Sequence, residues 1–286
     1  PNASVGQRFT VRVPPRYPGS CTQSTPIQAE LRLITDRGHW LIDVSNLSDS
    51  YSTAQLQQIA DQFEDNVAPS LEPMFGAIPD TDNNPRISFV VTGRVNQEGW
   101  LSYPSLYDYL PTSQCAASNE GDFLYVATPA AGTSFSPAFL LSVMGYSFAH
   151  DFTHVIQNRT LIGGGTRPPA WIDEGQAGIG EEVFAHRVTN RSARQNYGQA
   201  VIFLQIGQLQ PYSIVSSIGF YFGFQDAALP KVPGAPEQCT WLDPEDGGTV
   251  NSGPCEAPGP SAGAWAFRRW PPDHHGASVG SDGVLH

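Results

Sequence analysis

The segment from Pro137 to about Asn158 constrains the fold of this chain more than any other. Its apolar residues recur at helical spacing, and the proline suits the first turn of a helix. Within it lies the run HDFTH, in which His150 and His154 stand four residues apart. Residues i and i+4 share one face of a helix, so the two imidazoles can point at a single ion. We therefore expect a long helix that carries a two-histidine metal site.

A third protein ligand is expected elsewhere, because a catalytic zinc site normally has three, with an open position for water. Glu174 stands 20 residues after His154, in the run PPAWIDEGQAGIGEEV. We expect a second helix from Trp171 to about Arg187, with Glu174 in its first turn. The connection LIGGGTRPP would return this helix antiparallel to the first and bring Glu174 back toward the histidines.

Asp151 lies between the two histidines and is rotated by about 100° from His150 around the helix. Its carboxylate would lie beside the metal rather than on it, which is the position of a general base. Two plainer interpretations remain open. The histidines can be hydrogen-bonded residues of an ordinary helix, and Glu174 can be a first-turn acid that complements the helix dipole.

The runs HDFTH and WIDEG together resemble the pattern of the gluzincin zinc metallopeptidases, which is His-Glu-x-x-His and, roughly twenty residues later, Trp-x-(Asn/Asp)-Glu-Gly. The upstream runs FGAIPDTDNNPRISFVVT and SNEGDFLYVATP look most like those of the hyicolysin-like peptidases within that clan. The resemblance covers about residues 50–225. It implies an α+β, zincin-like fold with a small mixed sheet, an active-site helix and a helical C-terminal part.

The same resemblance implies Zn2+ held by His150, His154 and Glu174, with Asp151 in the place of the catalytic glutamate. In the family, that glutamate accepts a proton from zinc-bound water as the water attacks the scissile carbonyl. Asp is one methylene shorter, and a misplacement of about 1 Å can cost on the order of 10²-fold in rate. We therefore expect a secreted zinc metallopeptidase that hydrolyses peptide bonds, with an activity that Asp151 can weaken.

The same departure leaves a second function open. The chain can be a non-catalytic protein of metallopeptidase fold that serves as an extracellular structural or assembly component. In that case the protein would assemble with copies of itself, and residues 229–286 would form contacts in the assembly. A third function, hydrolysis of oligosaccharides by Glu181 and Glu182, is disfavoured because adjacent side chains do not face each other.

The outer shell of the site also departs from the family pattern. Many gluzincins place an Asp one turn after the third ligand, where this chain has Gly178. Glu181 or Glu182 could orient a ligand instead. The group that stabilises the oxyanion is left open among three tyrosines, Tyr197, Tyr212 and Tyr221.

Composition limits the partners and the location. Lys and Arg total 15 against 27 Asp and Glu, and the formal net charge of -12 opposes nucleic-acid phosphates and anionic lipids. No apolar run approaches the ~20 residues that span a bilayer. Four cysteines and few lysines are typical of a secreted protein. The start PNASVGQRF, without Met or an apolar leader, indicates a mature or trimmed chain.

The four cysteines allow three pairings, of which we favour one. Cys239 and Cys255 flank a Gly-, Pro- and Asp-rich loop that a local disulfide would close. Cys21 and Cys115 would then form a long-range disulfide. No CxxC motif occurs, so a cysteine-based metal cluster is disfavoured.

The remaining segments predict three parts: a β-rich segment over residues 1–50, a zincin-like core over 51–228, and a Gly- and Pro-rich segment over 229–286 that packs on the core. Further elements are expected as follows: a helix from about Thr53 to Val67, a buried strand in RISFVVT, a strand from Asp122 to Thr128, and helices over 193–209 and 262–270. Peptide substrates would enter along an edge strand, which we place at residues 122–128.

The run PDTDNNPR offers alternating oxygen ligands of the kind found in calcium loops, from Asp80, Asp82, Asn83 and Asn84. It lacks the Gly and the later Glu of an EF-hand. We therefore favour a plain turn over a Ca2+ site.

Overall fold

The computed structural model describes residues 3–15, 21–162, 165 and 170–190, with residues 170–172 and 174 described by their backbone alone. The chain divides into two compact units, Pro1–Arg167 and Pro168–His286. The predicted helices over 193–209 and 262–270 lie outside the described residues, as does the segment 229–286.

The first unit contains a six-stranded sheet in the order β1-β2-β3-β4-β6-β5. The strands are β1 (Arg8–Val13), β2 (Thr25–Ile34), β3 (Gly38–Asp43), β4 (Ile87–Val91), β5 (Ser102–Pro104) and β6 (Phe123–Val126). Strands β3, β4 and β6 run parallel, and the outer pairs are antiparallel. The predicted α+β class with a mixed sheet is confirmed, and the β-rich start of the chain supplies half of that sheet.

The helices are α1 (Thr53–Gln62), the π-helical turn η2 (Phe63–Val67), α2 (Ala68–Phe75), α3 (Gly93–Gln97), α4 (Pro137–Gln157) and, in the second unit, α5 (Ala170–Thr189); short 3₁₀ helices are η1 (Val44–Asn46), η3 (Leu106–Tyr109) and η4 (Asn158–Leu161). Three of the predicted helical segments are observed as α1, α4 and α5, whereas α3 and the short 3₁₀ helices were not predicted. The helix predicted to end at Val67 continues into α2, because a proline is tolerated in the first turn of a helix. None of the helices in the described residues combines the length and the apolarity that a membrane crossing requires.

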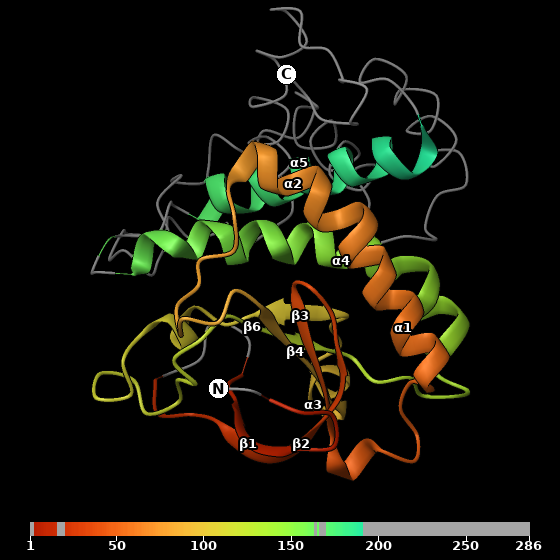
Figure 1. The fold of residues 1–286 in the computed structure, drawn as a ribbon, viewed down its shortest axis with the longest axis vertical. Helices are drawn as coiled ribbons and strands as arrows, with labels where there is room; N and C mark the ends of the chain where they lie inside the picture. Colours follow the sequence, from red (N-terminus) through yellow and green to blue (C-terminus); the bar gives the residue numbers. More distant parts are fainter. Residues whose placement is uncertain (1–2, 16–20, 163–164, 166–169, 191–286) are drawn as a thin grey trace, which may run out of the picture. The chain divides into compact units, whose positions relative to one another are not determined.

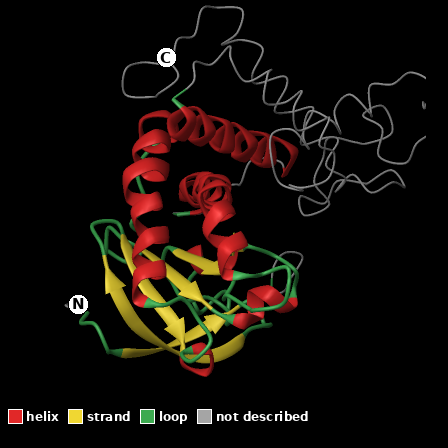
Figure 2. Ribbon diagram, turned by 90° about the vertical axis from the view of Figure 1, so that its right-hand side faces the viewer, coloured by secondary structure: helices red, strands yellow, loops and turns green. Residues whose placement is uncertain are grey.

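In the first unit, α1 and α4 lie on the same side of the sheet (Figures 1 and 2). Helix α1 begins with a capping box, in which Ser52 accepts a hydrogen bond from the Gln55 backbone and the Gln55 side chain accepts one from the Ser52 backbone. Ser136 caps α4 in a similar way, by accepting a hydrogen bond from the backbone N–H of Phe139. Both long helices therefore begin where local sequence satisfies their first backbone donors.

Helix α4 is oriented by two aromatic side chains on its buried face. Phe148 packs edge-on against Phe89 of β4, with ring centroids 5.4 Å apart, and Phe152 packs against Phe63 of η2 at 5.1 Å. All four rings are fully buried. Successive helix residues are rotated by about 100°, so His150 is rotated by about 200° from Phe148 and is half-buried. The aromatic packing therefore sets the direction in which the histidines point.

The expected edge strand is not at the edge. The strand predicted over residues 122–128 exists as β6, but β6 pairs with β4 on one side and with β5 on the other. The edge on that side of the sheet is formed by β5, which is three residues long, and the opposite edge by β1. A strand this short shows no period-2 pattern in the sequence, so its pairing with β6 could not be read there.

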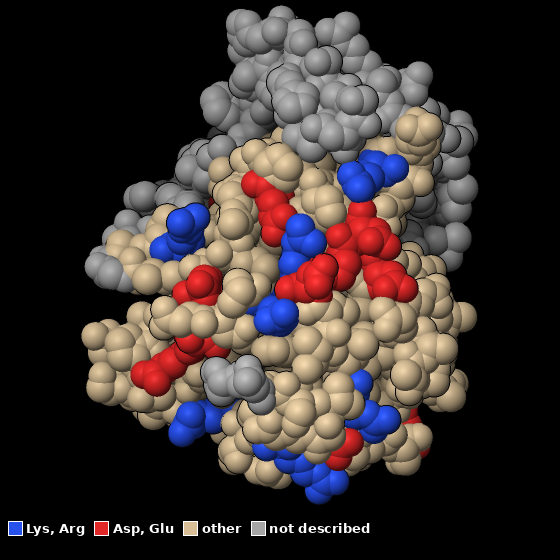
Figure 3. Space-filling model, viewed as in Figure 1, with Lys and Arg blue, Asp and Glu red and all other residues tan. Residues whose placement is uncertain are grey.

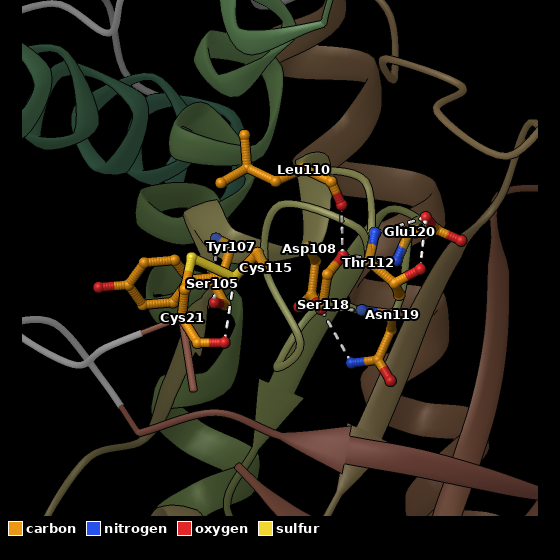
Figure 4. The surroundings of a disulfide bond; sticks show 10 residues. All are labelled: Cys21, Ser105, Tyr107, Asp108, Leu110, Thr112, Cys115, Ser118, Asn119 and Glu120. Atoms are coloured by element: carbon orange, nitrogen blue, oxygen red, sulfur yellow. Dashed lines mark hydrogen bonds between the residues drawn. A yellow bond between two sulfur atoms is a disulfide. The ribbon is translucent and has the colours of Figure 1, made fainter. Parts of the chain in front are cut away.

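The predicted disulfide between Cys21 and Cys115 is present (Figure 4). It fixes the loop that leads from β5 to β6, and the backbone N–H of Ala117 donates to the Cys21 carbonyl at 2.8 Å. Within this loop, the Ser118 hydroxyl donates to the Leu110 carbonyl at 2.6 Å. The second predicted pair, Cys239 and Cys255, lies outside the described residues.

Arg37, in the turn between β2 and β3, joins the sheet to the helical layer. Its guanidinium donates to both carboxylate oxygens of Glu72 at 3.0 and 3.1 Å, and to Glu64 at 3.1 Å. On the face shown in Figure 3, acidic and basic side chains lie next to one another. Some of the acidic side chains are therefore paired locally with an arginine.

Candidate metal centre

Three residues of α4, His150, Asp151 and His154, form a group that could hold a metal ion. One ligand atom from each lies within 4.8 Å of the others. The Nε2 atoms of the two histidines are 3.1 Å apart. His154 and Asp151 are buried, whereas His150 is half-buried and is the most accessible member of the group. The i,i+4 spacing therefore produces the convergence that the sequence predicts.

The separation of the histidines can be compared with the requirement of a zinc ion. Two nitrogens that each bind one ion at 2.0–2.1 Å with a tetrahedral angle are about 3.3 Å apart. The observed Nε2–Nε2 distance of 3.1 Å is close to this value. A direct hydrogen bond between a protonated and an unprotonated imidazole would give a similar distance. The pair therefore fits zinc, and it also fits other divalent ions that accept imidazole ligands.

The carboxylate of Asp151 is held by hydroxyl groups from two elements. Ser102 of β5 donates a hydrogen bond to Oδ2 of Asp151. The Oγ of Ser102 lies 2.5 Å from the Oγ of Ser147, which is on α4 one turn before Asp151. Ser102 and Asp151 are only 6% and 5% exposed. These contacts join the helix of the candidate site to the edge strand of the sheet.

Neither serine was predicted from the sequence. The helical spacing could have indicated Ser147, since a residue at i−4 lies on the same helix face as Asp151. Ser102 could not be found in this way, because nothing in the local sequence marks β5 as a strand that reaches α4. Its contribution depends on the pairing of β5 with β6.

Glu174 is the fifth residue of α5, so the predicted second helix is confirmed but begins before Trp171. The acid in the first turn is Asp173 rather than Glu174, contrary to the prediction. The Glu174 side chain is outside what the structure describes, and α5 belongs to the second unit. Its role as a metal ligand therefore stays a prediction.

Two other acids of α5, Glu181 and Glu182, are buried. Glu182 Oε1 lies 3.4 Å from Nε2 of His186, one turn further on, and the His186 side chain is buried as well. This Glu182–His186 contact was not predicted from the sequence, although its i,i+4 spacing could have indicated it. The three candidate oxyanion residues, Tyr197, Tyr212 and Tyr221, lie outside the described residues.

The run considered for calcium forms a turn stabilised by its own hydrogen bonds. Asp80 and Asn83 adopt positive φ angles of 59° and 57°. The Asn84 backbone donates to Asp82 at 3.2 Å, and the Thr81 backbone donates to Asp122 at 2.9 Å. Burial raises the pKa of Asp122 to about 6, although the hydrogen bonds from Thr81 lower it. Asp82 and Asp122 oxygens are therefore engaged in holding the turn against β6.

Comparison with known protein families and curated proteins found no relative of this chain: no protein-family model matches it, and no curated protein is significantly similar to it. The interpretation of the site therefore depends on its own residues: a convergent histidine pair, and a buried carboxylate beside it that is fixed by hydroxyl groups.

Proposed function

We propose that this protein is a zinc-dependent metallopeptidase of the gluzincin type. Zn2+ would be held by His150, His154 and Glu174, and Asp151 would act as the general base. The proposal is carried by one observation, the 3.1 Å separation of the two histidine Nε2 atoms beside a buried carboxylate. The HDFTH and WIDEG runs supply the resemblance and the third ligand.

We also propose a zincin-like fold, in which α4 is the active-site helix. It is supported by the contact of α4 with β5, the antiparallel edge strand of a mixed sheet. Peptide or protein substrates would add in an extended conformation to the side of β5 that faces away from β6, through backbone hydrogen bonds. This replaces the entry site that we expected at residues 122–128.

The proposed chemistry divides between the ion and the chain. A bound zinc ion would supply a Lewis acid that polarises the scissile carbonyl and activates water. The two imidazoles would bind through unprotonated Nε2 atoms. The Asp151 carboxylate would accept the proton of the attacking water and pass it to the nitrogen of the leaving amine, so that the base is regenerated in each turnover.

We further propose that the protein works outside the cell. The disulfide between Cys21 and Cys115 supports this location, because such bonds persist in oxidising compartments. The proposal accords with the secreted location expected from composition.

The proposal is tested by measuring bound metal and casein hydrolysis for the wild type and three variants, His154→Ala, Glu174→Gln and Asp151→Glu. We expect zinc in the wild type and in Asp151→Glu, and loss of zinc from the two ligand variants. Hydrolysis should be inhibited by a chelator and restored by zinc. Phe139→Ala, a change on α4 outside the histidine group, serves as the control that should retain both metal and activity.

The possible results separate the two functions that the sequence left open. Zinc with hydrolysis in the wild type supports a working peptidase. Zinc in both proteins with hydrolysis only in Asp151→Glu supports the non-catalytic structural or assembly protein. A wild type that binds no zinc, or a His154→Ala variant that binds it as tightly as the wild type, would refute the metal site.

A further inference from the structure

We propose that Ser102, on the edge strand β5, is a positioning residue that holds the Asp151 carboxylate in its working orientation. The inference deepens the proposed function and rests on it. It is drawn from a chain of hydroxyl groups, Ser147 to Ser102 to Asp151, that bridges α4 and β5.

The direction of the hydrogen bonds in this chain follows from the number of protons. A serine hydroxyl has one proton to donate and can accept through its lone pairs. Ser102 donates its proton to Oδ2 of Asp151. The 2.5 Å contact between Ser102 Oγ and Ser147 Oγ is therefore a bond that Ser147 donates to Ser102. The chain ends on the carboxylate, and each hydroxyl orients the next.

All three members of this hydrogen-bonded chain lie on regular secondary structure. Ser102 is paired with Val126 of β6, and the Ala127 N–H donates to the Leu101 carbonyl at 2.8 Å directly beside it. Ser147 and Asp151 are one turn apart on α4. A hydrogen bond from a hydroxyl to a carboxylate is among the stronger kinds, and Ser102 and Asp151 are both buried. The carboxylate is therefore held between a strand and a helix that pack against each other.

The hydrogen bond from Ser102 bears on the replacement of the gluzincin glutamate by Asp151. The aspartate is one methylene shorter than a glutamate, so its carboxylate has less reach and must be aimed accurately. Misplacement of a reacting group by about 1 Å can cost on the order of 10²-fold in rate. We expect that loss of the Ser102 hydroxyl lowers kcat by about 10- to 100-fold. A purely structural tie between α4 and β5 would lower stability and leave kcat unchanged.

The test compares Ser102→Ala, Ser102→Thr and a matched control, Ser70→Ala. Ser70 is a fully buried serine on α2 whose hydroxyl donates to the Asn66 carbonyl, outside the candidate site. For each protein we would measure kcat and KM on a fluorogenic peptide, zinc content and the thermal midpoint. Ser102→Ala should lose kcat with unchanged KM and zinc content. Ser102→Thr, which keeps the hydroxyl on a strand, should recover most of it, and Ser70→Ala should keep kcat.

A second variant keeps the inference testable if Ser102→Ala does not fold. Ser147→Ala removes the donor to Ser102 and should lower kcat by a smaller factor, with KM and zinc content unchanged. A folded Ser102→Ala with wild-type kcat would overturn the inference and leave the proposed function intact. A wild type without zinc or without hydrolysis would overturn the proposed function, and the inference would fall with it.

Discussion

Asp108 provides a stability prediction that can be worked out from the structure. It lies in η3, within the loop that the Cys21–Cys115 disulfide fixes, and it is completely buried. Its carboxylate accepts hydrogen bonds from the backbone and side-chain nitrogens of Asn119, both at 2.8 Å, and from the Tyr125 hydroxyl at 2.7 Å. Burial raises the pKa of Asp108 from 3.8 to about 7, although these hydrogen bonds lower it.

The sign of the effect follows from the protons bound in each state. Because the pKa of Asp108 is higher in the folded protein than in the unfolded chain, the folded state keeps a proton between about pH 4 and pH 7 that the unfolded chain has lost. The free energy of unfolding therefore falls as pH rises through this range and becomes level above it. The difference between the pKa values of Asp108 in the unfolded and folded states sets an upper limit of about 4 kcal/mol on the fall in the free energy of unfolding. The raised pKa of Asp122, to about 6, acts in the same direction.

The variant Asp108→Asn should remove most of this pH dependence. The amide oxygen of an asparagine at position 108 can accept a hydrogen bond from Asn119, and its amide nitrogen can donate one to the Tyr125 hydroxyl. That hydroxyl can then donate to the Arg12 carbonyl, which lies 3.1 Å away. The measurement is urea unfolding at intervals from pH 4 to pH 8, with the disulfide intact. Asp36→Asn, which changes an exposed acid, is the control and should follow the wild type. Equal slopes for the wild type and Asp108→Asn would refute the reasoning.

Three further predictions follow from other contacts. Replacing Cys21 and Cys115 together by Ser should lower the free energy of unfolding by about 4 kcal/mol, because the disulfide joins residues separated by 94 positions; calorimetry measures the loss, and one below about 1 kcal/mol would contradict this reading. Phe148→Ala should cost about 3–5 kcal/mol in urea unfolding, since its ring is fully buried among other rings, and a much smaller loss would show that the cavity closes. The effects of Ser102→Ala and Asp151→Glu on kcat should not be additive, because the Ser102 hydroxyl donates directly to the Asp151 carboxylate; additive effects in the double-mutant cycle would argue against a role for that contact.

Local sequence patterns predicted most of the elements and part of the site. Helical periodicity placed α4 within a residue of its observed bounds, and the i,i+4 spacing predicted the convergence of His150 and His154. Turn-rich sequence around Cys239 and Cys255 led to the correct assignment of Cys21 to Cys115. These features depend on geometry that repeats every few residues, or on a small number of possible pairings, so a single sequence is sufficient to find them.

The tertiary structure decided what depends on distant segments meeting. The three residues of β5 become an edge strand only because they pair with β6, and this pairing brings the Ser102 hydroxyl to Asp151, 49 residues away along the chain. The burial that raises the pKa of Asp108 likewise depends on β6 and its loop packing together. The periodicity of the sequence does not predict such contacts. They are stabilised by the packing of whole elements against one another, and not by residues that are neighbours in the sequence. The sequence alone determined that two histidines could converge on a metal, and the fold determined how the carboxylate beside them is held.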